Sequence, residues 1–142
     1  SSDLARARTS NQLLVRITDP LAEILRAQRI LLVLDAPKRH GMFQVVSSCL
    51  PPGESENTLV DAITPWLNEA RRARNARLYH GPAGASKSEQ RSCLICALRV
   101  RGKAWGFLYA DTDGVLGRFE EPERALFAAL ESTTRTTFSL LP

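Results

Sequence analysis

Two apolar segments separated by a two-residue connection constrain the fold of this chain more than any other feature. Residues 92–100 and 103–111 flank Arg101-Gly102, and such a spacing with a glycine in the connection is typical of a β-hairpin. Apolar side chains occupy both alternating sets of positions in each segment. Because successive side chains of a strand point to opposite faces, both faces of this hairpin need a cover. The sequence therefore predicts Ser92–Val100 paired antiparallel with Lys103–Asp111 inside a covered sheet.

Hydrophobic periodicity divides the rest of the chain into helices and strands, since helical spacing predicts a helix and a short aliphatic run predicts a strand. The expected elements begin with a helix over 4–28 that restarts at Pro20, followed by strands Arg29–Asp35 and Met42–Leu50. A helix between Leu59 and Arg74 comes next, capped by Asn57 or Thr58 and bent or restarted at Pro65, and a strand Ala76–His80 follows it. The hairpin, a loop Asp111–Gly117 and a last helix with Pro122 in its first turn come last. This order predicts an α+β fold, with one antiparallel sheet of about five to six strands and helices on both faces.

Composition and charge limit the classes of protein to which the chain can belong. Its 142 residues are 44% hydrophobic and 24% charged, which is typical of one globular domain. The longest apolar run, Ile30–Leu34, is far too short to cross a membrane. The net charge is +4, but the basic residues are dispersed and no aromatic residues alternate with them, as single-strand-binding surfaces require. We therefore expect no nucleic-acid partner and no membrane contact by this domain.

Three cysteines are present, at positions 49, 93 and 96. An odd, low number is unlike a secreted disulfide scaffold and fits a reducing compartment, so we expect a cytoplasmic location. The spacing of Cys93 and Cys96 would suit a redox or zinc site on a turn. On a strand it places the α-carbons about 10 Å apart and the side chains on opposite faces, which exceeds the ~7 Å limit for a disulfide. The sequence predicts two reduced, separately buried thiols and no metal site.

The hairpin and the segment after it resemble the closing part of GAF domains. An apolar strand ends in Ala97-Leu98, turns through Arg101-Gly102 and returns with Gly106-Phe-Leu108. The following stretch, which contains Phe119 and Glu123 ahead of an apolar helix, is similar to the opening of the family's last helix. The motifs cover about the last fifty residues, and the order of elements covers nearly the whole chain.

This resemblance implies a sensory or regulatory domain in signal transduction. GAF domains hold small ligands such as cyclic nucleotides or tetrapyrroles between the sheet and the segment that caps it. Many also form homodimers through their terminal helices, here near Leu4–Leu14 and Phe138–Leu141, and pass a signal to a covalently linked output domain, as in two-component systems. The chain then reads as a single domain, residues 1–142, of a larger signalling protein. Two alternatives stay open: a ligand-free dimerisation and relay module, and a cysteine-based methionine sulfoxide reductase.

The candidate ligand-binding residues are Trp66, Arg77, His80 and Tyr109. Aromatic rings can stack on a ligand, and the basic side chains can hold a polar group. Each has a structural alternative, because Trp66 and Tyr109 also suit the core, Arg77 a solvated surface and His80 a strand end. Neither histidine follows a cysteine, so covalent attachment of a tetrapyrrole is not expected. The residues identify no cofactor, no metal ligands and no catalytic group, and we expect the domain not to be an enzyme.

Overall fold

The computed structural model describes residues 20–35 and 43–140, with side chains up to residue 132. Its elements are a helical segment at 20–25, β1 (Arg29–Asp35), β2 (Phe43–Cys49), α2 (Glu56–Arg72), β3 (Arg77–Gly81), a 3₁₀ turn η1 (Lys87–Glu89), β4 (Arg91–Val100), β5 (Lys103–Asp113) and α3 (Glu121–Leu140). The strands form one sheet in the order β2-β1-β5-β4-β3. All neighbours are antiparallel, which confirms the predicted α+β fold.

The predicted hairpin is confirmed, with β4 paired to β5 through Arg101-Gly102. Both turn residues have positive φ, 55° at Arg101 and 81° at Gly102, which is the backbone of a type I′ turn and suits the twist of the flanking strands. Gly106 of the same hairpin lies against β1, where an added Cβ would come 2.7 Å from the carbonyl oxygen of Val33. A glycine here therefore lets β1 and β5 approach closely.

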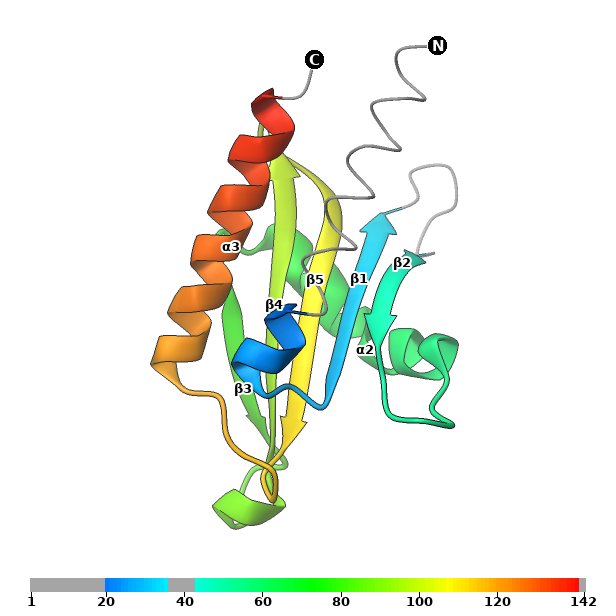
Figure 1. Cartoon of the computed structure of the whole chain (residues 1–142), viewed down its shortest axis with the longest axis vertical. Helices are drawn as coiled ribbons and strands as arrows, with labels where there is room; N and C mark the ends of the chain where they lie inside the picture. Colours follow the sequence, from blue (N-terminus) through cyan, green and yellow to red (C-terminus); the bar gives the residue numbers. More distant parts are fainter. Residues whose placement is uncertain (1–19, 36–42, 141–142) are drawn as a thin grey trace.

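Helices cover both faces of the sheet, as predicted (Figure 1). On the α3 face, α3 and the helical segment 20–25 pack on a buried cluster that includes Leu94, Cys96 and Phe127. On the α2 face, α2 packs on a second cluster that includes Cys93 and Ile95. The two clusters take alternate residues of β4, so Cys93 and Cys96 point to opposite faces of the strand, as their odd spacing predicts.

Several local predictions need correction. The cap of α2 is Ser55, whose side chain accepts a hydrogen bond from the backbone N–H of Thr58, so neither Asn57 nor Thr58 is the cap. A bend or a restart was predicted at Pro65, and the restart does not occur because α2 continues through this residue. The carbonyl that proline leaves unbonded belongs to solvent-exposed Asp61. Several strand boundaries also differ by one or two residues. The strand predicted at Ala76 begins one residue later, and β5 continues to Asp113 where a loop was expected.

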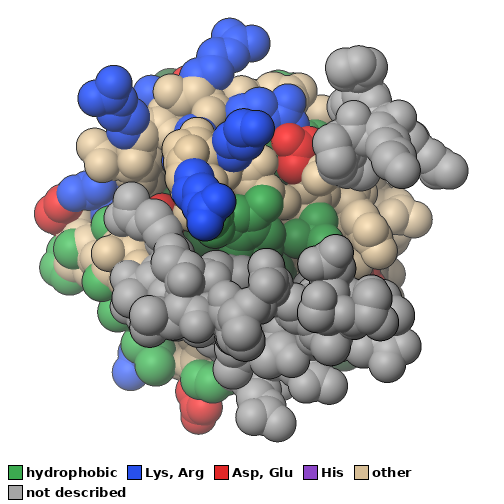
Figure 2. All heavy atoms as spheres, turned by 90° about the horizontal axis from the view of Figure 1, so that it is seen from above, with side chains coloured by type: hydrophobic (Ala, Val, Ile, Leu, Met, Phe, Trp, Pro, Cys, Tyr) green, Lys and Arg blue, Asp and Glu red, His purple; other side chains and the backbone are tan. Residues whose placement is uncertain are grey.

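The C-terminal end of α2 is firmly attached to the sheet. The guanidinium of Arg99 on β4 donates to the carbonyl oxygens of Ala70, Arg71 and Ala73, which satisfies carbonyls that a helix end leaves without partners. Arg71 in turn pairs with Asp35 at 2.9 Å. Figure 2 shows this end of the molecule, where Lys and Arg side chains gather around a small hydrophobic area.

Several predictions fall outside the described residues. They are the part of the first helix before Pro20, the dimer contact at Leu4–Leu14, and the side chains of the second dimer contact at Phe138–Leu141. The helical segment that is described ends at residue 25, three residues before the predicted end. Within the described part of the chain, no helix combines the length and the apolar character that a membrane crossing needs.

Candidate ligand-binding site

A cavity of about 480 Å³ lies between the N-terminal half of α2 and the sheet, a size typical of small-molecule sites. One wall is α2 with Leu59, Ala62, Ile63 and Trp66, and the opposite wall comes from β1, β4 and β5. The strand residues that line the cavity are Arg29, Arg91, Cys93 and Tyr109, and the rim is formed by residues 53–55 and Thr58.

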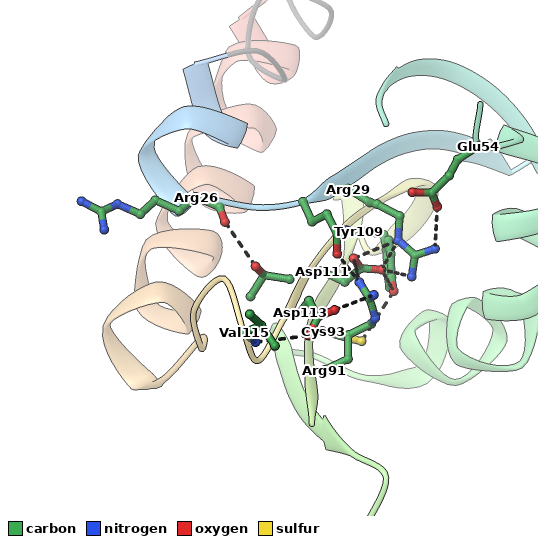
Figure 3. A network of polar contacts seen from close by, with 11 residues as sticks. Arg26, Arg29, Glu54, Arg91, Cys93, Tyr109, Asp111, Asp113 and Val115 are labelled. Atoms are coloured by element: carbon green, nitrogen blue, oxygen red, sulfur yellow. Dashed lines mark hydrogen bonds and ion pairs between the residues drawn. The ribbon is translucent and has the colours of Figure 1, made fainter. Parts of the chain in front are cut away.

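A fully buried carboxylate organises the strand side of this cavity (Figure 3). Asp111 is 0% exposed, and its oxygens accept from Arg29 Nε at 2.9 Å, Arg91 Nη1 at 2.9 Å and the Tyr109 hydroxyl at 2.6 Å. Arg29 Nη2 lies 2.7 Å from the same carboxylate. A buried charge is tolerated only when it is paired and hydrogen-bonded, and Asp111 meets both conditions.

The register of the strands places these groups together. Arg29 on β1 lies directly opposite Asp111 on β5, and Cys93 on β4 lies opposite Asp111 from the other side. Tyr109 and Arg91 are each two residues along a strand from these positions, so all of them share the α2 face. The network is therefore built into the sheet and is independent of α2.

Burial and the charges of this network shift three pKa values. Burial, followed by the negative charge of Asp111, raises the pKa of Tyr109 far above its usual range, so its hydroxyl stays a donor. Burial also raises the pKa of the Cys93 thiol. Burial acts to lower the pKa of Arg29, but hydrogen bonding and ion pairing with Asp111 outweigh it and raise that pKa. Each group keeps its proton at neutral pH.

Arg29 also connects the buried network to the rim. Its Nη1 donates to Glu54 Oε1 at 3.2 Å, and Glu54 belongs to the segment that joins β2 to α2. The Glu54 side chain is 36% exposed, whereas that of Arg29 is 19% exposed. One guanidinium thus bridges a buried carboxylate and a solvent-accessible one.

The structure brings together two of the four candidate residues that the sequence indicated. Trp66 and Tyr109 both line the cavity, and the Trp66 ring stacks on Tyr79 with centroids 5.5 Å apart. Arg77 lies elsewhere, exposed beside Glu69 at 3.5 Å. His80 lies on the α3 side, where its Nε2 is 2.8 Å from the carbonyl oxygen of Phe119. Neither Arg77 nor His80 lines the cavity.

Sequence reasoning missed the charged residues that line the cavity, namely Arg29, Glu54 and Arg91, and the buried Asp111 behind them. A signal existed, because a charged residue stands at the end of each apolar strand concerned. It could not be interpreted without the pairing of β1 with β5, since Arg29 and Asp111 are 82 residues apart in the chain.

A second hollow of about 300 Å³ lies beside residues 24–26 and the loop at 116–118. Its lining includes Thr112, Arg118 and Glu123 but no aromatic side chain. The cavity beneath α2 combines aromatic, apolar and charged walls, so it is the stronger candidate for a ligand site.

Comparison with known proteins bears on the fold of the chain. Solved structures with the same fold include a GAF domain/HD domain protein from Geobacter sulfurreducens, with 13% identity, a TM-score of 0.67 and 93% of each chain covered. The GAF domain region of a second Geobacter sulfurreducens protein has 14% identity and a TM-score of 0.70 over 99% of each chain. The blue-light absorbing form of the Thermosynechococcus elongatus PixJ GAF domain has 15% identity and a TM-score of 0.64, over 95% of this chain and 88% of that one.

At these identities the structural likeness shows the fold alone. A search among curated proteins finds no significant match. The sequence model of the GAF domain, in contrast, matches residues 10–131. That range contains the whole sheet, α2, the cavity and the first half of α3. The chain therefore belongs to the GAF domain family.

Proposed function

We propose that this chain is a sensory domain that binds a small molecule in the cavity beneath α2. The observation that carries the proposal is the cavity itself, which is about 480 Å³ in volume and lined by Trp66, Tyr109 and two arginines. Apolar walls with a few fixed polar groups are the usual composition of a ligand site. The polar groups here are held by the Asp111 network before any ligand arrives, so little ordering is needed on binding.

The relay of the signal forms a second part of the proposal. Ligand contacts with Leu59, Ile63 and Trp66 would act on the N-terminal half of α2, while Arg99 holds the other end of the helix. We propose that the chain is one domain of a larger signalling protein, that its terminal helices form a homodimer, and that they carry the change to an output domain.

The state of the cysteines supports a role without catalysis. A catalytic thiol needs exposure and a lowered pKa, whereas burial raises the pKa of both Cys93 and Cys96. Their positions on opposite faces of β4 also separate the two sulfurs. We do not extend the light absorption of the PixJ domain to this chain, because neither of its histidines follows a cysteine.

A cavity-filling variant tests the proposal. Ala62 is an exposed alanine on the α2 wall of the cavity, and Ala62→Phe adds a ring at this wall. Ala125 is an exposed alanine on α3, so Ala125→Phe adds the same ring away from the cavity. A metabolite library is screened against the chain by NMR chemical-shift changes. We expect compounds that shift the Trp66 indole signal in the original chain and in Ala125→Phe, but not in Ala62→Phe.

If no compound in the library shifts the Trp66 signal, the ligand-sensing proposal fails. The ligand-free dimerisation and relay module then becomes the better description. If compounds bind equally well to Ala62→Phe, the ligand site lies elsewhere on the domain.

A further inference from the structure

We propose that the ligand carries an anionic oxygen group, a carboxylate or a phosphate, and that Glu54 occupies its place on Arg29 until the ligand displaces it. This inference rests on the proposed function of the cavity and names the chemical class that it takes. It is carried by the charges lining the cavity and by the two-sided contacts of Arg29.

The strand side of the cavity has more positive than negative charge. Arg29 and Arg91 both line it, while the one carboxylate between them is Asp111. Asp113 lies 3.8 Å from Arg91 and is 42% exposed, so solvent screens much of its charge. The two arginines therefore share one buried carboxylate, and their other ionic partners, Glu54 on Arg29 and Asp113 on Arg91, are partly exposed. A ligand anion can take the place of such an exposed partner.

Arg29 is already oriented for such a contact. Its Nε and Nη2 bind Asp111, and this fixes the plane of the guanidinium and turns Nη1 toward the rim. A guanidinium is the group whose planar set of donors best matches carboxylates and phosphates. A fixed guanidinium, 19% exposed at the edge of a cavity, binds an anion with little loss of side-chain freedom.

In this structure the acceptor of Arg29 Nη1 is the carboxylate of Glu54, at 3.2 Å. Exposed ion pairs of this kind contribute only about 0–1 kcal/mol, so a competing anion can replace Glu54. Nothing lies within 4 Å of the position that a Cβ on Gly53 would take, so no side chain packs against the segment at this residue. Ser55 and Thr58 of the first turn of α2 also line the cavity, and the positive end of the helix favours an anion there.

Displacement of Glu54 would also couple binding to conformation. Glu54 immediately precedes Ser55, the cap of α2. A ligand anion that takes the place of Glu54 on Arg29 therefore releases the segment that leads into α2, without a change in the Asp111 network behind it.

Matched probes that differ only in charge test the inference. Benzoate and benzamide have nearly the same shape, and phenyl phosphate distinguishes a phosphate from a carboxylate. Each is titrated into the chain while the Trp66 indole and Thr58 amide signals are followed by NMR. We expect at least one of the two anions to bind ten or more times as tightly as benzamide, which is the effect of one charge-assisted hydrogen bond.

Variants at the rim sharpen the test. Glu54→Gln removes the competing carboxylate, so we expect tighter binding of the anion by roughly two- to fivefold, with benzamide unchanged. Glu56→Gln is the control, because Glu56 is an exposed carboxylate of the first turn that does not line the cavity. It should change the affinity less than twofold. Arg91→Gln, with its fold checked by circular dichroism, should weaken anion binding.

The inference is overturned if benzamide binds as tightly as both anions, or if Glu54→Gln has no larger effect than Glu56→Gln. In either case binding that Ala62→Phe abolishes would still support the ligand-sensing function. A library that yields only neutral ligands of the cavity also overturns the inference and leaves the function intact. A complete absence of ligands overturns both.

Discussion

The two faces of the sheet are formed by alternate residues of the same strands, yet they are used differently. On the α3 face, Phe119 and Phe127 are fully buried in a cluster of apolar side chains. On the α2 face, the apolar cluster shares the surface with a cavity and a buried ion-pair network around Asp111. α3 lies along the sheet in Figure 1, while α2 lies behind it. The comparison shows that one face is closed by apolar packing, whereas the other combines an apolar cluster with a cavity and fixed charges.

The largest expected effect comes from removing an aromatic ring from each face. Phe127→Ala empties a closed part of the α3 face, so it should lower the free energy of unfolding by about 3–5 kcal/mol. Trp66→Ala removes a half-buried ring beside an existing cavity and should cost about half as much. Urea denaturation measures both. Equal losses would contradict the difference between the faces.

The polar network of the α2 face gives the next test. Asp111→Asn keeps the shape of the side chain but leaves Arg29 and Arg91 without their buried carboxylate. We expect a loss of about 3 kcal/mol, at the low end for a broken buried pair because both arginines reach solvent. Asp113→Asn is the matched control and should change stability by less than about 0.5 kcal/mol. A similar cost for both variants would mean that the network contributes little.

The cysteines on the two faces of the sheet should affect stability differently at alkaline pH. Burial raises the pKa of Cys96 above the ordinary value of 9.0. Below pH 9 the Cys96 thiol is protonated in both the folded and the unfolded chain, so it adds no pH dependence to the free energy of unfolding. Above pH 9 the Cys96 thiol loses its proton in the unfolded chain but keeps it in the folded chain. The free energy of unfolding therefore falls by about 1 kcal/mol per pH unit. Denaturation at several pH values should show that the free energy of unfolding falls less steeply with pH in Cys96→Ala than in Cys93→Ala. The reason is that Cys93 lines the cavity and is less completely surrounded by protein.

The smallest expected effect is a difference in thiol labelling. Cys93 and Cys96 lie three positions apart on β4 and are 4% and 2% exposed, but only Cys93 lines the cavity. With a small reagent such as iodoacetamide, mass spectrometry of peptides should find Cys93 modified before Cys96. A cavity ligand should slow the labelling of Cys93 alone. Equal rates at both positions would show that reagent enters by global unfolding.

Much of the fold could be predicted because its signals are local. The hairpin depends on a two-residue turn that needs positive φ, and the chain supplies Arg101-Gly102 at that point. The alternation along β4 separates Cys93 from Cys96 on opposite faces whatever the rest of the chain does. Within the described residues, the elements that differ from prediction, such as the cap at Ser55, differ by a few positions.

The candidate site was only partly predictable. Trp66 and Tyr109 stood out because aromatic rings can stack on a ligand, and both line the cavity. Arg77 and His80 stood out by their type alone. Their positions depend on which face of the edge strand β3 they occupy and on what packs there, and neither can be read from local sequence.

The sequence by itself determined the strands, their alternation and the hairpin, because turn geometry and the two-residue period of a strand act between neighbours. Only the tertiary structure decided that β1 enters the sheet beside β5, which sets Arg29 against Asp111, and that α2 leaves a cavity beneath its N-terminal half. The physical reason is that a strand with two apolar faces can be covered by any amphipathic helix. Which helix covers it, and how closely, depends on contacts between residues far apart in the chain.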